Sequence, residues 1–188
     1  MKMSYHELVQ FLINKYGPAK YDYFTNEYCT IKNKKVTRTS EGLFFHHIDE
    51  DKAILLSSSE YASQNPFEYQ RANRLVYCNF LEHLLLHILI FEEPKNIDAN
   101  RDEIQGIGGA IFYLCGQLND IYNGYHLKEE WRKNVASVVI NDYESYILIL
   151  RRLWKDIQEN KYSFFRIPKE ELAKGWDGTL YTKILNDL

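Results

Sequence analysis

The sequence predicts a single α+β protein that is predominantly helical. Residues 79–91 are apolar almost throughout, so a helix over them is buried on nearly all sides. Short apolar runs around Phe44 and Val76 are typical of strands. Beyond residue 94, apolar residues recur at helical spacing through most of the chain. Together these observations favour a short stretch of strands within a helical frame.

The composition is that of a soluble globular protein long enough to bury a core. The chain has 188 residues, 45% of them hydrophobic and 26% charged. We divide it into residues 1–42, 43–93 and 94–188, which form one compact unit. The net charge of −3 argues against a general nucleic-acid coat, but residues 1–40 carry seven basic and three acidic side chains (7 − 3 = +4). This basic end is either a solvated face or a phosphate-tracking surface.

Cysteine usage and the N-terminus predict a cytoplasmic protein. Cys29, Cys78 and Cys115 lie far apart without a Cys-x-x-Cys pair, so we expect neither a cysteine-rich zinc ribbon nor a disulfide framework. The first residues lack the apolar segment of a signal peptide. The apolar run at 79–91 is shorter than the roughly 20 residues that span a bilayer. We therefore expect no membrane partner.

Residues 1–42 predict a helix followed by a basic hairpin. Ser4 and Glu7 form a capping box, and Gly17-Pro18 ends the helix. Asn33 then lies in a lysine-rich turn between two short strand-like runs, which predicts a β-hairpin. Such a hairpin presents three lysines to whatever passes the neighbouring region.

Residues 43–93 carry the strands and the buried helix. Residues 43–48, Leu-Phe-Phe-His-His-Ile, predict a strand, and an acidic run follows at 49–51. A short helical segment at 60–63 leads to a second strand at 75–77. Asn79 caps the buried helix, and Glu82 completes a second capping box.

Residues 94–188 predict helices without a catalytic signature. Three glycines at 106, 108 and 109 open a helix over 101–122, and close helix packing explains them because neither a Gly-x-Gly-x-x-Gly nor a Walker pattern is present. Residues 127–160 predict a long helix that forms an antiparallel hairpin with the preceding one. A short helix at 167–172 and the chain end dock on this bundle or on a second subunit. We expect these helices to position substrate or to bind a second copy or another protein.

Four histidines in two pairs point to a metal site. His83 and His87 are four residues apart, so they share one face of the apolar helix. A buried polar group without a partner costs about 1–3 kcal/mol, and one metal ion satisfies both rings. His46 and His47 on the strand supply further ligands, and because adjacent strand residues face opposite ways, these two take different roles. The alternative is a set of core histidines bonded to backbone or carboxylate groups.

These residues resemble the HNH endonucleases of the His-Me finger, or ββα-metal, superfamily. The resemblance covers about residues 43–90, is closest to the small phage and plasmid HNH proteins, and includes the ligand spacing of the colicin-type DNases. It implies a ββα-metal finger embedded in the helical protein and metal-dependent hydrolysis of phosphodiester bonds. It also implies that His46, His83 and His87 bind the metal and that His47 is the general base that activates water. Double-stranded DNA is the nucleic-acid partner by family analogy, although the residues do not distinguish it from RNA.

One position departs from the family pattern. The middle asparagine usually stands nine residues before the first helix histidine, where this chain has Arg74, with Asn73 one step earlier. Either Arg74 or Asn73 is expected to take the catalytic role of the family's asparagine. The forked donors of Arg71 and Arg74 suit phosphate, and ion pairs with the acidic run at 49–51 are the alternative. The predicted phosphate-binding residues are Arg71, Arg74, Lys34, Lys35 and Arg38.

The ligand set restricts the choice of metal. Three imidazoles favour a borderline divalent ion such as zinc, nickel or manganese over magnesium. Asp49 and Glu50 are available to accept from the imidazole N–H groups, while Glu82 serves first as a helix cap. Two rival interpretations remain. One is a non-catalytic, zinc-stabilised module that binds nucleic acid or protein through a degenerate HNH site, and the other is a helical scaffold whose histidines are core residues.

Overall fold

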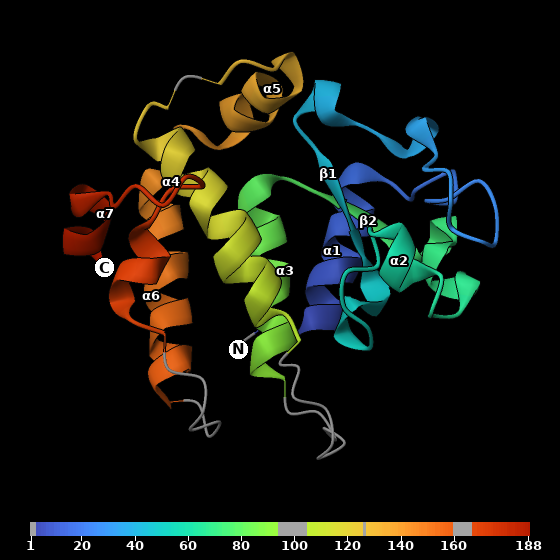
Figure 1. The fold of residues 1–188 in the computed structure, drawn as a ribbon, viewed down its shortest axis with the longest axis horizontal. Helices are drawn as coiled ribbons and strands as arrows, with labels where there is room; N and C mark the ends of the chain where they lie inside the picture. Colours follow the sequence, from blue (N-terminus) through green and yellow to red (C-terminus); the bar gives the residue numbers. More distant parts are fainter. Residues whose placement is uncertain (1–2, 94–104, 126, 160–166) are drawn as a thin grey trace.

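A computed structural model describes residues 3–93, 105–125, 127–159 and 167–188 (Figure 1). Over these residues the chain is predominantly helical with a small antiparallel sheet, which confirms the predicted class. The helices and strands are α1 Tyr5–Tyr16, β1 Phe44–His47, α2 Ser59–Ala62, β2 Leu75–Cys78, α3 Phe80–Glu92, a π-helix Gly109–Cys115, α4 Gly116–Tyr122, α5 Glu130–Val139, α6 Tyr143–Glu159 and α7 Thr182–Asp187. Short 3-10 helices lie at Lys34–Val36, Thr39–Glu41, Ile48–Asp51, Phe67–Gln70, Ala72–Arg74 and Lys169–Ala173.

Helix α3 lies at the centre of the molecule. Figure 1 shows α1, α2 and both strands on one side of it and α4, α6 and α7 on the other. Because α3 is apolar nearly all round, it contributes to two cores at once. Leu84 and Ile88 pack with the C-terminal helices, and Leu86 packs with α1. Of the helices in the described part of the chain, none is both long and apolar enough to cross a membrane.

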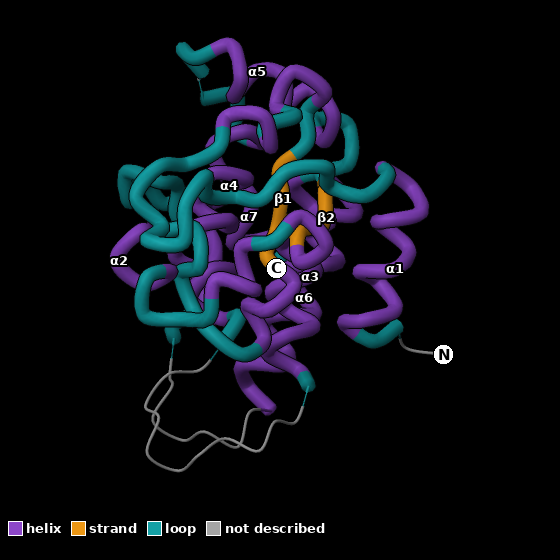
Figure 2. The backbone as a smooth tube through the Cα atoms, turned by 90° about the vertical axis from the view of Figure 1, so that its right-hand side faces the viewer, coloured by secondary structure: helices purple, strands orange, loops and turns teal. Residues whose placement is uncertain are grey.

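The two-stranded sheet places β1 next to α3. Strands β1 and β2 pair antiparallel, with His46 opposite Val76 and His47 opposite Leu75 (Figure 2). Helix α3 starts two residues after β2 and has the predicted capping box, in which Asn79 and Glu82 satisfy each other's backbone N–H groups. The short connection fixes α3 beside the sheet.

The predicted basic hairpin is wrong, whereas the predicted first helix is correct. Helix α1 has the Ser4–Glu7 capping box and ends before Gly17. In place of the hairpin, Lys34–Val36 is a 3-10 helix, and Phe24 and Lys32 form an isolated bridge. The Asn33 side chain accepts from the Lys35 N–H and donates to the Asp22 carbonyl. These side-chain bonds replace the ladder that a hairpin needs.

The C-terminal half is helical, but its long helix is divided. Residues 127–160 do not form one helix, because α5 ends at Val139 and α6 begins at Tyr143. Asn141 and Asp142 lie at the break, and both residue types favour turns over helix interiors. The chain end docks on the bundle, where the Tyr143 hydroxyl on α6 donates to the Asp187 carboxylate at 2.6 Å. Three predicted boundaries cannot be compared with the structure, because they lie at or outside the limits of the described residues. They are the region boundary after residue 93, the helix start at 101 and the helix end at 160.

Candidate metal centre

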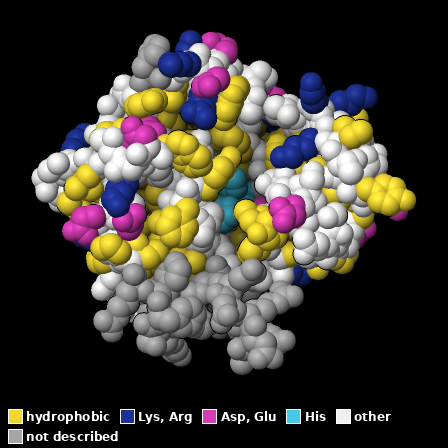
Figure 3. Space-filling view, in the orientation of Figure 1, with side chains coloured by type: hydrophobic (Ala, Val, Ile, Leu, Met, Phe, Trp, Pro, Cys, Tyr) yellow, Lys and Arg dark blue, Asp and Glu magenta, His cyan; other side chains and the backbone are white. Residues whose placement is uncertain are grey.

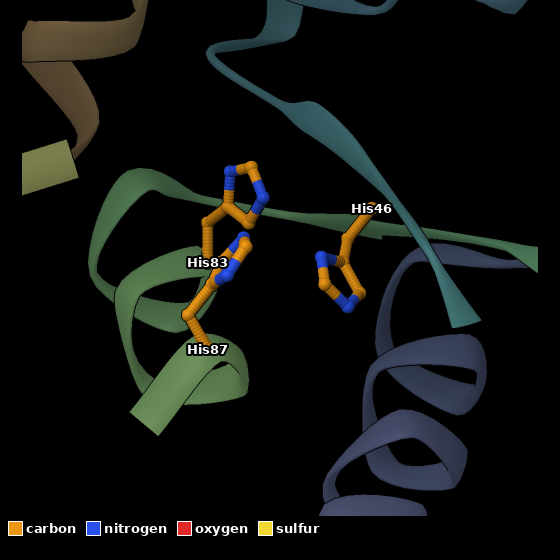
Figure 4. A group of neighbouring side chains, drawn as sticks. All are labelled: His46, His83 and His87. Carbon is orange, nitrogen blue, oxygen red and sulfur yellow. The ribbon is translucent and has the colours of Figure 1, made fainter. Parts of the chain in front are cut away.

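Three imidazoles from two elements meet beside α3. His46 lies on β1, and His83 and His87 lie one turn apart on α3 (Figure 4). Their ligand atoms all lie within 4.8 Å of one another, and the ring centroids are 5.0 to 5.2 Å apart. The four-residue spacing gives the helix pair a common face, and the sheet register directs His46 towards it.

The hydrogen bonds of His46 fix its tautomer. The Tyr5 hydroxyl oxygen lies 2.8 Å from the Ile48 carbonyl oxygen and 2.9 Å from Nε2 of His46. A carbonyl oxygen only accepts, so the single hydroxyl proton goes to Ile48 and the imidazole donates from Nε2. Nδ1 of His46 therefore carries a lone pair. This nitrogen is buried and has no hydrogen-bond partner among the described residues.

His87 is fixed in the opposite tautomer by the glycine-rich segment. Its Nδ1 lies 3.2 Å from the carbonyl oxygen of Gly106, so Nδ1 carries the proton and Nε2 the lone pair. Gly109 lies against the same ring, because a Cβ atom there would come within 2.4 Å of Cε1 of His87. These two glycines pack on α3, as the sequence predicts, and they also hold a histidine in place.

Burial keeps the three imidazoles neutral. Desolvation lowers the pKa of His46 to about 3, against the opposing effect of the Glu50 carboxylate. It also lowers the pKa of His83 well below the ordinary value of histidine, and that of His87 below it. Nδ1 of His83 is a second buried nitrogen without a hydrogen-bond partner in the described part of the chain. The imidazoles therefore bring lone pairs to the cluster and no positive charge.

The carboxylate of Glu50 reaches into the same cluster. The 3-10 helix Ile48–Asp51 follows β1 directly and turns this side chain back towards α3. Oε2 of Glu50 lies 3.5 Å from Nδ1 of His46 and 3.4 Å from Nε2 of His87. Burial raises the pKa of Glu50, but the favourable electrostatic effect of the neighbouring imidazoles, that of His46 first, outweighs it and holds that pKa below its ordinary value. The carboxyl group is thus an ionised acceptor.

The cluster fits a divalent cation. Lone pairs of two nitrogens face a carboxylate oxygen, and no proton is available to lie between them. An unpaired buried polar atom costs about 1–3 kcal/mol, and Nδ1 of His46 and Nδ1 of His83 both lack a hydrogen-bond partner among the described residues. Imidazole nitrogen and carboxylate oxygen together suit zinc, nickel and manganese ions. His46, His83 and His87 are the residues that would hold such an ion.

His47 lies on the other face of β1 and is held by Gln70. The Gln70 amide donates to the Leu56 carbonyl, so its oxygen is the atom 3.0 Å from Nε2 of His47 and accepts from it. Nδ1 of His47 is then the lone-pair nitrogen, and it lies 3.7 Å from Oε1 of Glu50. His47 is 1% exposed. Glu50 thus lies between the three-histidine cluster and a separately oriented fourth imidazole.

Arg74 ties together the two ends of the connection between the strands. Its guanidinium donates to both carboxylate oxygens of Asp49, at 2.6 and 2.5 Å, and Lys52 binds the same carboxylate at 2.7 Å. Burial alone would raise the pKa of Asp49, but the bonds from Arg74 and Lys52 lower it. The neighbouring Asn73 is exposed on the 3-10 helix Ala72–Arg74. Of the two candidates for the asparagine position, the structure therefore engages Arg74 and leaves Asn73 at the surface.

The other predicted phosphate-binding residues differ in their exposure and in the ion pairs that they already form. Lys34 and Lys35 are exposed. Arg38 donates to both carboxylate oxygens of Glu41 and to the Tyr16 carbonyl, so its donors are already engaged. Arg71 pairs with Asp22 at 2.9 Å, although 43% of its side chain is exposed.

The cluster is accessible from one face. Histidine side chains are visible at the base of a hollow lined by hydrophobic side chains (Figure 3). His83 is partly exposed, and the Phe44 ring lies 6.1 Å from its ring, centroid to centroid. Phe44 also lines a pocket with Phe80 and Trp131. Aromatic side chains therefore lie next to the partly exposed His83.

The sequence does not predict the observed contacts of four residues at this site. Tyr5, Gln70 and Gly106 carry no local pattern that links them to a histidine forty or twenty positions away. The sequence offers Glu50 as an acceptor for imidazole N–H groups, and in the structure its Oε2 lies 3.4 to 3.5 Å from nitrogens of His87 and His46. The spacing of four residues between His46 and Glu50 indicates this contact only if the strand ends at His47. In a strand that continued past His47, Glu50 would lie too far along the strand to reach the His46 ring.

Comparisons with family models, with curated proteins and with solved structures found no match to this chain.

Proposed function

We propose that this chain is a metal-dependent nuclease of the HNH type, which hydrolyses phosphodiester bonds in nucleic acid, with double-stranded DNA as the first substrate to test. The observation that carries the proposal is the pairing of two features. Three neutral imidazoles lie close enough together to share a cation, and a fourth imidazole, oriented by Gln70, lies across Glu50 from them. The chain order β1, β2, α3 agrees with the order of elements in a ββα-metal finger, which supports the proposal.

The histidines of the cluster would hold a divalent ion, and Tyr5 and the Gly106 carbonyl fix their rings. When bound, the ion supplies positive charge that stabilises the negative charge developing on the phosphoryl oxygens and on the leaving oxygen. Holding the rings in one orientation matters because partners outside the ligand shell usually change metal affinity by about 10–100-fold.

His47 acts as the general base in this proposal. Its Nδ1 lone pair accepts a proton from the attacking water, while its Nε2–H stays bonded to Gln70. The ionised Glu50 beside Nδ1 then stabilises the imidazolium that results. Lys34 and Lys35 are exposed and would contact the nucleic-acid backbone, and Arg71 reaches phosphate if it exchanges its bond to Asp22.

The test is plasmid nicking with a panel of divalent ions, with wild type beside His47→Ala. A general base contributes at least about a hundredfold, so cleavage falls by that factor while metal affinity is retained. His6→Ala, which removes an exposed histidine on α1, is the matched control and keeps wild-type cleavage. Wild-type cleavage by His47→Ala would remove His47 from the mechanism.

A second candidate function is a non-catalytic metal-stabilised module that binds nucleic acid or protein. The observation in its favour is the burial of His47, which is 1% exposed and therefore closed to bulk water in this structure. If this second function is correct, the protein binds the metal and retains its fold, but neither wild type nor His47→Ala cleaves DNA with any ion of the panel.

A further inference from the structure

We propose that Glu50 is a fourth protein ligand of the metal centre, so that the chain offers three imidazoles and one carboxylate. The inference rests on the proposed function only in that a divalent ion occupies the cluster. It assigns Oε2 as the ligand atom, because this oxygen faces the lone pairs of both His46 Nδ1 and His87 Nε2.

The separations match ligand edges better than hydrogen bonds. Oε2 lies 3.5 Å from the His46 nitrogen and 3.4 Å from the His87 nitrogen. Charge-assisted N–H···O bonds are about 2.7–2.9 Å long, so neither separation is that of an imidazolium bonded to a carboxylate. Two ligand atoms that each lie about 2.1 Å from one ion are roughly 3.0–3.4 Å apart at octahedral or tetrahedral angles.

The position of Glu50 is determined by the chain on either side of it. The 3-10 helix Ile48–Asp51 starts at the end of β1, and Asp49 within it is held by Arg74 and Lys52. The Glu50 side chain is 15% exposed, so it is held near the histidines and is not free in solvent. Without a cation, a carboxylate oxygen at this place faces two imidazole lone pairs, which is an unfavourable arrangement that a cation would relieve.

A carboxylate ligand restricts which ions support cleavage. Four protein ligands complete the shell of a tetrahedral ion such as structural zinc, whereas manganese and nickel ions take more ligands and keep positions for substrate oxygen. Zinc should therefore bind tightly and suppress cleavage by the protein, and manganese or nickel should support it.

The test compares the metal affinity and the Co²⁺ absorption spectrum of wild type with those of Glu50→Gln. Loss of a residue that only hydrogen-bonds to a metal ligand lowers metal affinity by about tenfold or more, so loss of a ligand itself should lower it by at least that factor. The loss should also change the visible Co²⁺ bands, which report ligand number and geometry. Without metal, the glutamine amide can donate to the two facing lone pairs, so the variant should be at least as stable as wild type. Opposite effects on metal affinity and on metal-free stability are the signature of a ligand.

Two further variants sharpen the result. Glu50→Asp keeps the charge but shortens the reach, and it should also lose affinity. Glu60→Gln, which changes an exposed carboxylate on α2, should match wild type in every measurement. Unchanged affinity and bands in Glu50→Gln would overturn the proposal. A loss of metal-free stability in that variant would also overturn it, since that result indicates a structural bond.

The experiment separates this inference from the proposed function. If wild type binds no Co²⁺ or Zn²⁺, or if His46→Ala binds as tightly as wild type, both fail. If Glu50→Gln behaves as a ligand variant and no nucleic acid is cleaved, the nuclease proposal fails and the four-ligand centre stands.

Discussion

Gly109 lies where the ring of His87 leaves no room for a side chain. An added Cβ would meet Cε1 at 2.4 Å and Nδ1 at 2.6 Å, so either the imidazole or the π-helix has to move. We expect Gly109→Ala to lower metal affinity by about tenfold or more, since displaced ligand orientation has effects of that size. Overpacking should also cost about 1–3 kcal/mol of metal-free stability. A competition titration against a chromogenic chelator measures the first effect, and urea unfolding the second.

Gly108→Ala is the matched control for this prediction. Gly108 is the preceding residue and also helical, but a Cβ there meets nothing within 4 Å. This substitution should leave metal affinity unchanged and add about 0.4–1 kcal/mol of stability by restricting the unfolded chain. Equal metal affinities in the two alanine variants would mean that Gly109 does not hold His87.

At the residue scale, the three-histidine cluster follows from spacing, but its surroundings do not. His83 and His87 share a face because they are four apart on a helix, and alternation on β1 separates His46 from His47. The partners Tyr5, Gln70 and Gly106 come from other elements. Their roles depend on tertiary packing, which a single sequence does not contain.

The ion pair between Arg74 and Asp49 fixes the two 3-10 helices that bracket the connection between β1 and β2. Asp49 is 0% exposed, so removing the guanidinium leaves a buried carboxylate bound only by Lys52. We expect Arg74→Gln to lower the free energy of unfolding by about 1–3 kcal/mol in urea titrations of the metal-free protein. A double-mutant cycle with Asp49→Asn should give a coupling energy of at least about 0.5 kcal/mol.

Arg71→Gln is the comparison for Arg74. Its partner Asp22 has 31% of its side chain exposed, and solvent weakens such a pair to about 0–1 kcal/mol. The loss of stability should therefore be smaller than that in Arg74→Gln. If the two variants lose the same amount, the Arg74 pair does not restrain the connection more than an ordinary surface pair.

At the element scale, helix ends were predictable where capping residues mark them. Ser4 with Glu7 and Asn79 with Glu82 give the starts of α1 and α3. The errors come from asparagine and aspartate, whose side chains bond locally to the backbone. Asn33 caps a 3-10 helix where a hairpin turn was expected, and Asn141-Asp142 lies where the long helix divides.

At the scale of the whole molecule, the three-histidine cluster lies where the two halves of the chain meet. β1 belongs to the half that packs with α1, whereas Gly106 and the π-helix belong to the half built on α4 and α6. The apolar composition of α3 predicted its central burial. Its contact with the glycine-rich segment follows only from how the C-terminal helices pack, because no pattern in residues 43–93 specifies it.

Removing the metal should therefore destabilise the whole chain. At a free metal concentration of 100 times Kd, binding adds about 2.7 kcal/mol to the free energy of unfolding. For a chain of this size that corresponds to about 5–10 °C in Tm, which a chelator should abolish in a thermal melt. His83→Ala should show a clearly smaller Tm shift on addition of the chelator, whereas His6→Ala, on the exposed face of α1, should show the full shift. A wild-type Tm that does not respond to chelator after metal loading would favour a helical scaffold whose histidines only pack, because a cation that contacts β1 and α3 together must bind the folded chain more tightly than the unfolded one.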